Sequence, residues 1–126
     1  DVKEITNQNG VDIIYDPIGG EYFSKSLKVI KWGGKILVIG FASGTIPNLP
    51  INIALIKGIS VLGVRAGEYF RKNPKLKQPA MNKLLSIANK GLITPVIHDT
   101  LKLKDASKAL KRIENREVIG RLILKP

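Results

Sequence analysis

The sequence contains no cysteine and a single histidine, His98. Without cysteine the chain forms no disulfide, and it offers neither a thiolate nucleophile nor a sulfur ligand for zinc. With one histidine it cannot build a multi-histidine metal site within a single chain. It also lacks any run of about 18 apolar residues, the length that a membrane-spanning helix needs. We therefore expect a cytoplasmic protein with no metal site and no membrane partner.

Acidic residues are scarce as well, with 10 Asp and Glu against 21 Lys and Arg, a net charge of +11. The excess is uneven: residues 1–70 hold seven basic and six acidic residues, whereas residues 71–126 hold fourteen and four. A basic half can attract nucleic acid. However, 16 of the basic residues are lysines, which suit solvated surfaces, and only five are arginines, which contact phosphates and bases best. We interpret the charge as a solvated face and keep a nucleic-acid-binding module as the alternative.

The first half of the chain alternates short apolar runs with a helical pattern. The size is that of one domain, and the apolar fraction of 44% is close to globular averages. Runs rich in β-branched residues predict strands, and apolar residues at helical spacing predict helices. We expect a strand at Val11–Tyr15, a helix at Glu21–Trp32, a strand at Ile36–Ile39, a connection over 41–58 with one helical turn at Ile53–Lys57, and a strand at Ile59–Val64. This order is typical of an α/β fold with a parallel sheet.

The second half has a different character, which places a boundary near residue 70. Residues 71–79 are basic and contain Pro74 and Pro79, which predicts an exposed linker. Further elements are expected as an amphipathic helix at Met81–Ala88 ended by Gly91, a strand at Thr94–Leu103, a helix at Ala106–Ile113 with Asp105 at its positive end, and a strand at Leu122–Leu124.

Few residues point to chemistry by spacing alone. Gly58 and Gly63 have the spacing of a phosphate-binding loop, but Val64 follows where that loop needs lysine, and no G-x-G-x-x-G fingerprint is present. Asp12 and Asp16 lie four residues apart along a strand and are interpreted as structural. His98 is expected to be a partly buried histidine of a strand. The tyrosines are expected to pack in the core or at its rim (Tyr15, Tyr22 and Tyr69).

Five segments together carry a family resemblance. They are GVDIIYDPIGG (residues 10–20), WGGKILVIGFASG (32–44), IPNLP (46–50), KGISVLG (57–63) and GRLIL (120–124). In this order they resemble the C-terminal portion of zinc-free medium-chain dehydrogenases/reductases of the quinone oxidoreductase (zeta-crystallin-like) group. The family usually has lysine at the position of Arg121, a small departure. Each motif is weak, but the resemblance covers essentially the whole chain.

The resemblance implies that two parts of a larger architecture are present. Residues 1–70 would be the C-terminal half of a Rossmann-type nucleotide-binding domain, holding its last three strands. Residues 71–126 would be a linking helix and the C-terminal part of a GroES-like catalytic domain. The first strands and the glycine-rich turn for the pyrophosphate would lie upstream. A start at Asp1 without methionine agrees with this, so we expect glycines of the G-x-G-x-x-G kind to be encoded before it.

The resemblance also implies a cofactor site. In open parallel sheets, ligands bind beyond the carboxyl ends of the strands, where glycines let the backbone approach a flat ring. By similarity, this chain would line both the adenosine and the nicotinamide ends of NADPH with Gly20, with Ile39, Gly40, Phe41 and Ala42, and with Leu62, Gly63 and Val64. Read without the family, the same glycines are ordinary turn residues after strands.

The family's reaction is hydride transfer from NAD(P)H to a small quinone or enone, with the cofactor carrying the difficult chemistry. Its preference for NADP is implied by the family only, and no catalytic acid or base can be nominated among these residues. The resemblance also implies a homo-oligomer. We expect the isolated chain to be inactive. A folded remnant without enzymatic function is the second alternative.

Overall fold

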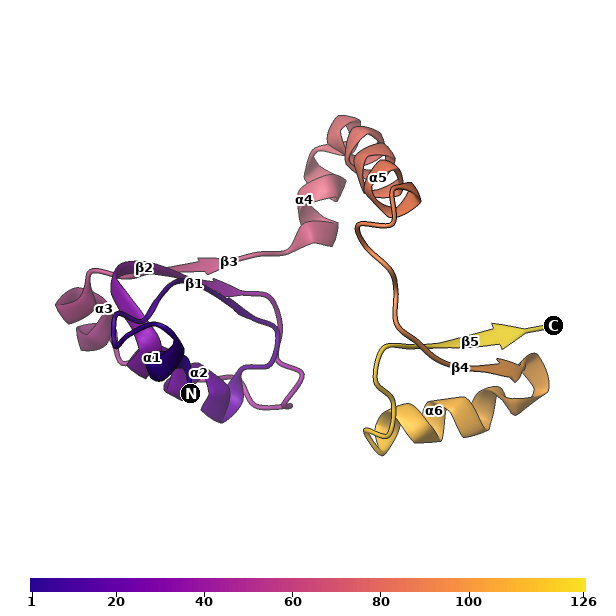
Figure 1. Ribbon diagram of the computed structural model, residues 1–126, viewed down its shortest axis with the longest axis horizontal. Helices are drawn as coiled ribbons and strands as arrows, with labels where there is room; N and C mark the ends of the chain where they lie inside the picture. Colours follow the sequence, from indigo (N-terminus) through magenta and orange to yellow (C-terminus); the bar gives the residue numbers. More distant parts are fainter. The chain divides into compact units, whose positions relative to one another are not determined.

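The computed structural model describes all residues, 1–126, and the chain divides into two compact units, Asp1–Lys72 and Asn73–Pro126. The first unit is built on a three-stranded sheet of β1 (Val11–Asp16), β2 (Ile30–Val38) and β3 (Ser60–Gly63). The strands are all parallel and lie in the order β1-β2-β3 (Figure 1). Helix α2 (Gly20–Val29) connects β1 to β2, and α3 (Ile51–Lys57) precedes β3. The predicted α/β class with a parallel sheet is confirmed.

A small apolar core joins α2 to this sheet. Phe23 and Leu27 occupy one face of α2, and both are buried. They pack with Ile30 and Ile36 of β2 and with Ile59, which precedes β3. Ile36 is fully enclosed, as expected for the central strand of a parallel sheet.

Helix α2 ends earlier than its apolar spacing predicts. The helix was expected to reach Trp32, but it stops at Val29, and Ile30 already has an extended backbone. Ile30 pairs with Val11, and the register then shifts so that Ile13 pairs with Lys35. Gly33, with φ of +74°, lies inside this irregular stretch. Pairing with β1 therefore outweighs helix formation at the three residues that follow Val29.

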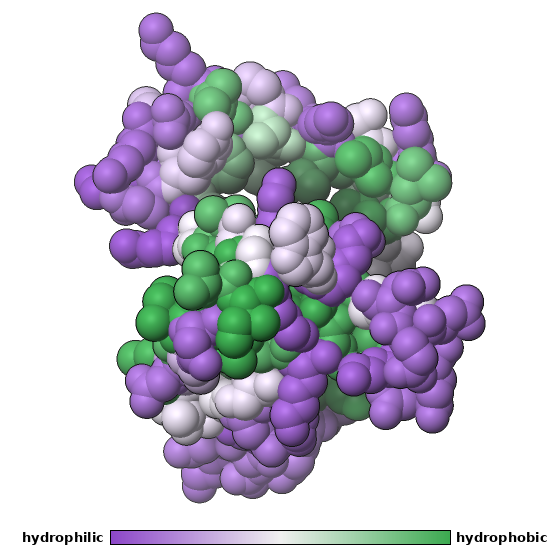
Figure 2. All heavy atoms as spheres, turned by 90° about the vertical axis from the view of Figure 1, so that its left-hand side faces the viewer, coloured by the Kyte–Doolittle hydropathy of each residue, from purple (hydrophilic) through white to green (hydrophobic).

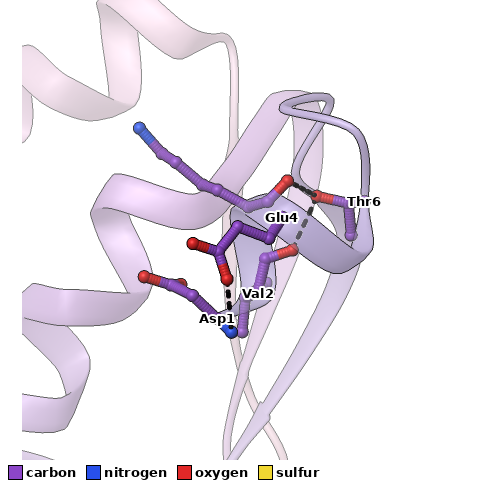
Figure 3. Close-up of polar contacts among 5 residues, drawn as sticks. Asp1, Val2, Glu4 and Thr6 are labelled. Carbon is purple, nitrogen blue, oxygen red and sulfur yellow. Dashed lines mark hydrogen bonds and ion pairs between the residues drawn. The ribbon is translucent and has the colours of Figure 1, made fainter.

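Helix α1 (Val2–Ile5) is a single turn fixed to the start of β1 by one hydroxyl. Thr6 Oγ1 donates to the carbonyl of Val2 at 2.8 Å, as Figure 3 shows, and accepts from the amide of Gly10 at 3.1 Å. The threonine thus closes the helical turn and ties it to the residue before β1.

Helix α3 is longer than the single turn predicted, and its outer face is apolar. Ile51, Leu55 and Ile56 are 75%, 84% and 68% exposed. Figure 2, which views the molecule from the side where α3 lies, shows apolar side chains gathered on this surface.

The ammonium of Lys57 points inward from α3. Its Nζ donates to the carbonyl oxygens of Leu27 at 2.7 Å and Ile30 at 3.1 Å. These carbonyls belong to the last turn of α2 and the first residue of β2. A lysine at this position satisfies carbonyls that the helix leaves unpaired, and its charge suits the negative end of the helix.

We expect Lys57→Met to lower the free energy of unfolding by about 1–3 kcal/mol, because two hydrogen bonds to a charged donor are lost. Lys28→Met is the matched control, since Lys28 is an exposed lysine of the neighbouring α2. Urea denaturation followed by circular dichroism measures both. Equal stability of the two variants would show that the Lys57 contacts contribute nothing.

The second unit contains α5 (Pro74–Asn89), β4 (Ile97–Lys102), the 3₁₀ turn η1 (Leu103–Asp105), α6 (Ala106–Glu114) and β5 (Arg121–Lys125). Strands β4 and β5 form a two-stranded parallel sheet. Gly91 follows the end of α5 with φ of +70°, and Asp105 is the N-cap of α6, as predicted. Strand β4 is shorter than the expected Thr94–Leu103, because Leu103 already belongs to η1.

The predicted linker over residues 71–79 is wrong. Helix α4 (Ala66–Lys72) contains the first of these residues, and α5 begins at Pro74. Proline is well suited to the first position of a helix, where its missing N–H would have no partner. Pro79 lies inside α5, which shows that a proline and a high charge do not by themselves prevent helix formation here.

Candidate cofactor site

The carboxyl ends of all three strands of the first unit lie at one edge of the sheet. Asp16 pairs with Val38, and Val38 pairs with Gly63. These are the last residues of β1, β2 and β3. The structure therefore brings together the three segments in which the predicted cofactor residues lie: Gly20 after β1, residues 39–42 after β2, and residues 62–64 at the end of β3.

Backbone hydrogen bonds join the loop after β1 to the loop after β2. Asp16 O accepts from the amides of Ile39 at 2.9 Å and Gly40 at 3.4 Å. Pro17 O accepts from Ala42 at 3.1 Å, and Ile18 O accepts from Ser43 at 3.0 Å. The two loops therefore form one structure that continues the pairing of β1 with β2.

The carboxylate of Asp16 organises the first loop. Asp16 is 5% exposed, and its Oδ1 accepts from the amides of Ile18 at 2.9 Å and Gly19 at 2.8 Å. The amide of Gly20 donates to Thr45 O at 3.0 Å. The amides of Ile18, Gly19 and Gly20 thus have partners within the chain. They are not free to hold a phosphate, as the amides of a phosphate-binding helix terminus are.

Gly20 is buried between the two loops. Its φ is +56°, and a Cβ there would lie 2.8 Å from Ser43 Oγ. Gly19 has φ of +69°, and its Cβ would lie 2.9 Å from Cδ1 of the Phe41 ring. Contacts inside the chain therefore explain both glycines. The roles of Ser43 and Thr45 in this packing are not indicated by the sequence, because they depend on the close approach of two loops.

The residues after β2 and at the end of β3 are more open. Phe41, Leu62 and Val64 are 41%, 45% and 36% exposed. A Cβ on Gly63 would meet no atom within 4 Å. Within 39–44 the amides of five residues are hydrogen-bonded inside the two loops, whereas that of Phe41 is not. The surface over Gly40–Ala42 and Leu62–Val64 can therefore accept a flat group and offers one amide donor to it.

Ionisable side chains are nearly absent from this edge. Among residues 16–20, 39–45 and 62–65 they are Asp16, whose carboxylate is held by the loop, and Arg65. The edge is suited to positioning a neutral group rather than to transferring protons. A hollow of about 490 Å³ lies elsewhere in the first unit and is lined by residues of α1 and α2, including Lys3, Lys25 and Lys28.

Of the other residues singled out from the sequence, Asp16 lies at this edge and the rest lie outside its loops. Asp12 is paired with Lys31, and Asp16 has the loop role described above. His98 lies in β4 but is exposed rather than partly buried. The tyrosines are also not in the core, with Tyr15, Tyr22 and Tyr69 being 66%, 51% and 55% exposed. The expected partial burial of His98 is therefore wrong, and of the two places expected for the tyrosines, core or rim, the core is excluded.

The zinc-binding dehydrogenase family matches residues 1–124. The chain belongs to this family. It is 34% identical over 124 residues to quinone oxidoreductase-like protein 2 homolog of Nematostella vectensis, covering 98% of this chain and 34% of that protein. It is 32% identical over 123 residues to quinone oxidoreductase-like protein 2 of Rattus norvegicus, covering 98% and 35%. The quinone oxidoreductase of Escherichia coli, solved with NADPH, matches with a TM-score of 0.84 and 27% identity over 99% of this chain and 39% of that one.

This chain therefore spans about a third of the length of the curated relatives it matches. It corresponds to the C-terminal portion of a zinc-free quinone oxidoreductase of the medium-chain group, as the sequence motifs indicated. The family description names zinc, whose protein ligands are cysteine, histidine and carboxylates. The chain has no cysteine, and no three of its His, Asp and Glu side chains come together. Its own residues do not fit a zinc site. None of its helices is long and apolar enough to cross a membrane.

Proposed function

We propose that this chain forms part of an enzyme that transfers hydride from NADPH to a small quinone or enone. Its relatives among the NAD(P)H-dependent oxidoreductases support this proposal. In that enzyme, residues 1–70 are the C-terminal half of the nucleotide-binding domain. Residues 71–126 contribute to the catalytic domain. The observation that carries the proposal is the edge where three parallel strands end together beside an open, uncharged surface.

The proposed role of this edge is to hold the nicotinamide. The nicotinamide ring is flat, and its carboxamide oxygen accepts hydrogen bonds. The backbone at Gly40 and Gly63 allows close approach, and the amide of Phe41 is available as a donor. Ile39, Ala42, Leu62 and Val64 supply the surrounding apolar surface. Gly20 is proposed to lie toward the adenosine end.

The distribution of charge in this chain supports the proposal that different segments bind the nicotinamide and the phosphates. From Ile36 to Val64 the one charged residue is Lys57, whose ammonium is bonded to two backbone carbonyls. The amides of Ile18, Gly19 and Gly20 are also engaged. The loops at this edge therefore offer little to the phosphates of a dinucleotide, and we propose that segments outside this chain bind the pyrophosphate and any 2′-phosphate. NADP rather than NAD is proposed from the family and from the NADPH of the E. coli structure.

Gly63→Val tests the proposed site with little disturbance of the chain. A Cβ added at this position meets no atom within 4 Å, and valine suits a strand. We expect the KM for NADPH to rise at least about tenfold, because the methyl groups occupy the place of the nicotinamide and a loss of about 1.4 kcal/mol is tenfold. The host is a chimera in which this chain replaces the matching portion of the E. coli quinone oxidoreductase.

Ser60→Val is the control, since it places the same valine side chain at an exposed position at the other end of β3. The KM of that variant is expected to equal that of the parent chimera. Unchanged KM in both variants would exclude residues 62–64 from the cofactor site. We do not propose nucleic-acid binding, because no observation other than net charge favours it.

A further inference from the structure

The second unit contains a histidine placed at an irregularity of its sheet. Strand β4 pairs with β5 through Ile97 with Arg121 and then through Asp99 with Leu122, so His98 is the extra residue between two register partners. A bulge of this kind redirects the side chain of the extra residue. Here the Nδ1 atom of His98 accepts from the amide of Ile119 at 3.3 Å. Ile119 lies in the turn between α6 and β5, far from β4 in the sequence.

Two polar contacts tie α6 and its following turn to β4. One is the His98 contact, and the other is the ion pair between Arg112 of α6 and Asp99, at 2.8 Å. The turn itself has two residues with positive φ, Arg116 at +59° and Gly120 at +92°. After Gly120 the chain is anchored again, because the amide of Arg121 donates to Val96 O at 2.9 Å. The stretch 116–119 is thus a short loop held to β4 by one imidazole.

These contacts respond differently to acid. A neutral imidazole with its proton on Nε2 accepts at Nδ1, whereas an imidazolium carries protons on both nitrogens and accepts at neither. Histidine is the side chain that changes charge most readily between pH 5 and 8. Asp99 behaves otherwise, because its hydrogen bonds from Arg112 and from the Thr100 amide hold its pKa below the usual range. The ion pair therefore persists at a pH where an imidazolium forms.

We propose that His98 is a pH-sensitive latch that holds the α6–β5 turn against β4 and releases it when the imidazole is protonated. Protonation replaces the acceptor with a second N–H that faces the N–H of Ile119. The charged residues of the elements that meet here are Asp99 on β4 with its partner Arg112 on α6, Arg116 and Glu117 in the turn, and Arg121 on β5.

The structure leaves room for the released turn to move. A hollow of about 250 Å³ lies beside it, lined by Ile113, Val118, Gly120, Arg121 and Leu122. Because Asp99 still holds α6 and Val96 still holds Arg121, the change is confined to the turn. The inference concerns the second unit alone and does not depend on the proposed cofactor site.

The test uses the whole 126-residue chain and amide hydrogen exchange measured by NMR at pH 8 and pH 5.5, corrected for the intrinsic pH dependence of exchange. We expect the protection of the Ile119 amide to fall about three- to tenfold at the lower pH, as for the loss of one hydrogen bond. The His98→Asn variant keeps an acceptor near the place of Nδ1 but does not titrate. Its protection at Ile119 is expected to be the same at both pH values.

A histidine nitrogen spectrum at pH 8 supplies an independent measurement, because it should show the proton on Nε2. Equal protection of Ile119 in the parent chain at both pH values would overturn the proposal. So would a fall of the same size in His98→Asn, or a proton on Nδ1 at pH 8.

Discussion

Titration of the isolated 126-residue chain with NADPH should show binding weaker than micromolar or no binding at all. The isolated chain should also not reduce quinones. The physical reason lies in the loops described above. Asp16 and Thr45 engage the amides of Ile18, Gly19 and Gly20, so these amides of the first loop are not available for the pyrophosphate. The proposed site over Gly40 and Gly63 would contact one end of the cofactor at most. Binding energy from the phosphates would be missing.

The size of the expected effect follows from that missing contribution. A dinucleotide held at micromolar affinity needs about 8 kcal/mol, and one amide plus a small apolar surface supplies only a fraction of this. Isothermal titration calorimetry measures the affinity, and NADPH oxidation with a soluble quinone measures the activity. The chimera with the remainder of the E. coli quinone oxidoreductase is the positive control. It should recover both, because the remainder then comes from a protein that binds NADPH.

A micromolar dissociation constant for the isolated chain would contradict this expectation. It would mean that the strand ends of the first unit hold the cofactor without the pyrophosphate turn. A chimera that folds but binds no NADPH would contradict the proposed function itself, so the two failures can be told apart.

Strands and helices could be predicted where the pattern of apolar residues and the pairing of the backbone favour the same element. The run Ile36–Ile39 predicts a strand covered on both faces, and Ile36 is the fully enclosed residue of β2. The opposite face of the sheet is open, because Ile13 and Leu62 on that face are 60% and 45% exposed, so this part of the prediction is wrong. The spacing of Phe23, Leu27 and Ile30 predicts that all three are buried, which is correct. It does not predict that Ile30 reaches the core from a strand. The spacing of apolar residues indicates which side chains face the core, but not whether each of them belongs to a helix or to a strand.

The location of the candidate site could be predicted from the sequence, but the hydrogen bonds within it could not. Parallel strands must end at the same edge, so the glycine-rich segments after β1, β2 and β3 had to meet. The sequence does not indicate that Asp16 would accept two amides, because that depends on a turn geometry formed only when the loops pack. Burial of His98 was mispredicted for a related reason. Exposure is decided by neighbours in space, and this side chain has few.

The last expected result concerns association, because the sheets of this chain have open edges. Strand β1 pairs only with β2, and β3 pairs only with β2, so each presents one row of unpaired backbone groups. Strands β4 and β5 likewise each have one free edge. Ile13 of β1 and Leu62 of β3 are 60% and 45% exposed. Open edges with apolar side chains are templates for pairing with another chain. We therefore predict a dimer or larger assembly at micromolar concentration.

Electrostatic repulsion between the positively charged copies opposes this association, and added salt should weaken that repulsion. The net charge of +11 repels a second copy, but it is carried almost entirely by residues 71–126, and α3 and β3 contain one charged residue, the inward-bonded Lys57. The Debye length falls from about 30 Å at 0.01 M salt to about 8 Å at 0.15 M. Association through the first unit should therefore increase as salt rises. Light scattering at the two salt concentrations measures it.

Substitutions on the two edges of the first sheet locate the contact. Ile13→Lys on β1 and Leu62→Lys on β3 each place a charge on an open edge, which is the means by which natural proteins keep edges apart. We expect either or both to raise the dissociation constant about tenfold or more, equivalent to about 1.4 kcal/mol. Ile5→Lys, at an exposed position of α1, adds the same charge away from any strand and controls for net charge. A parent chain that remains monomeric at low and at high salt would refute the prediction. It would show that the exposed apolar groups of β1, α3 and β3 are too weak to overcome the entropy of association.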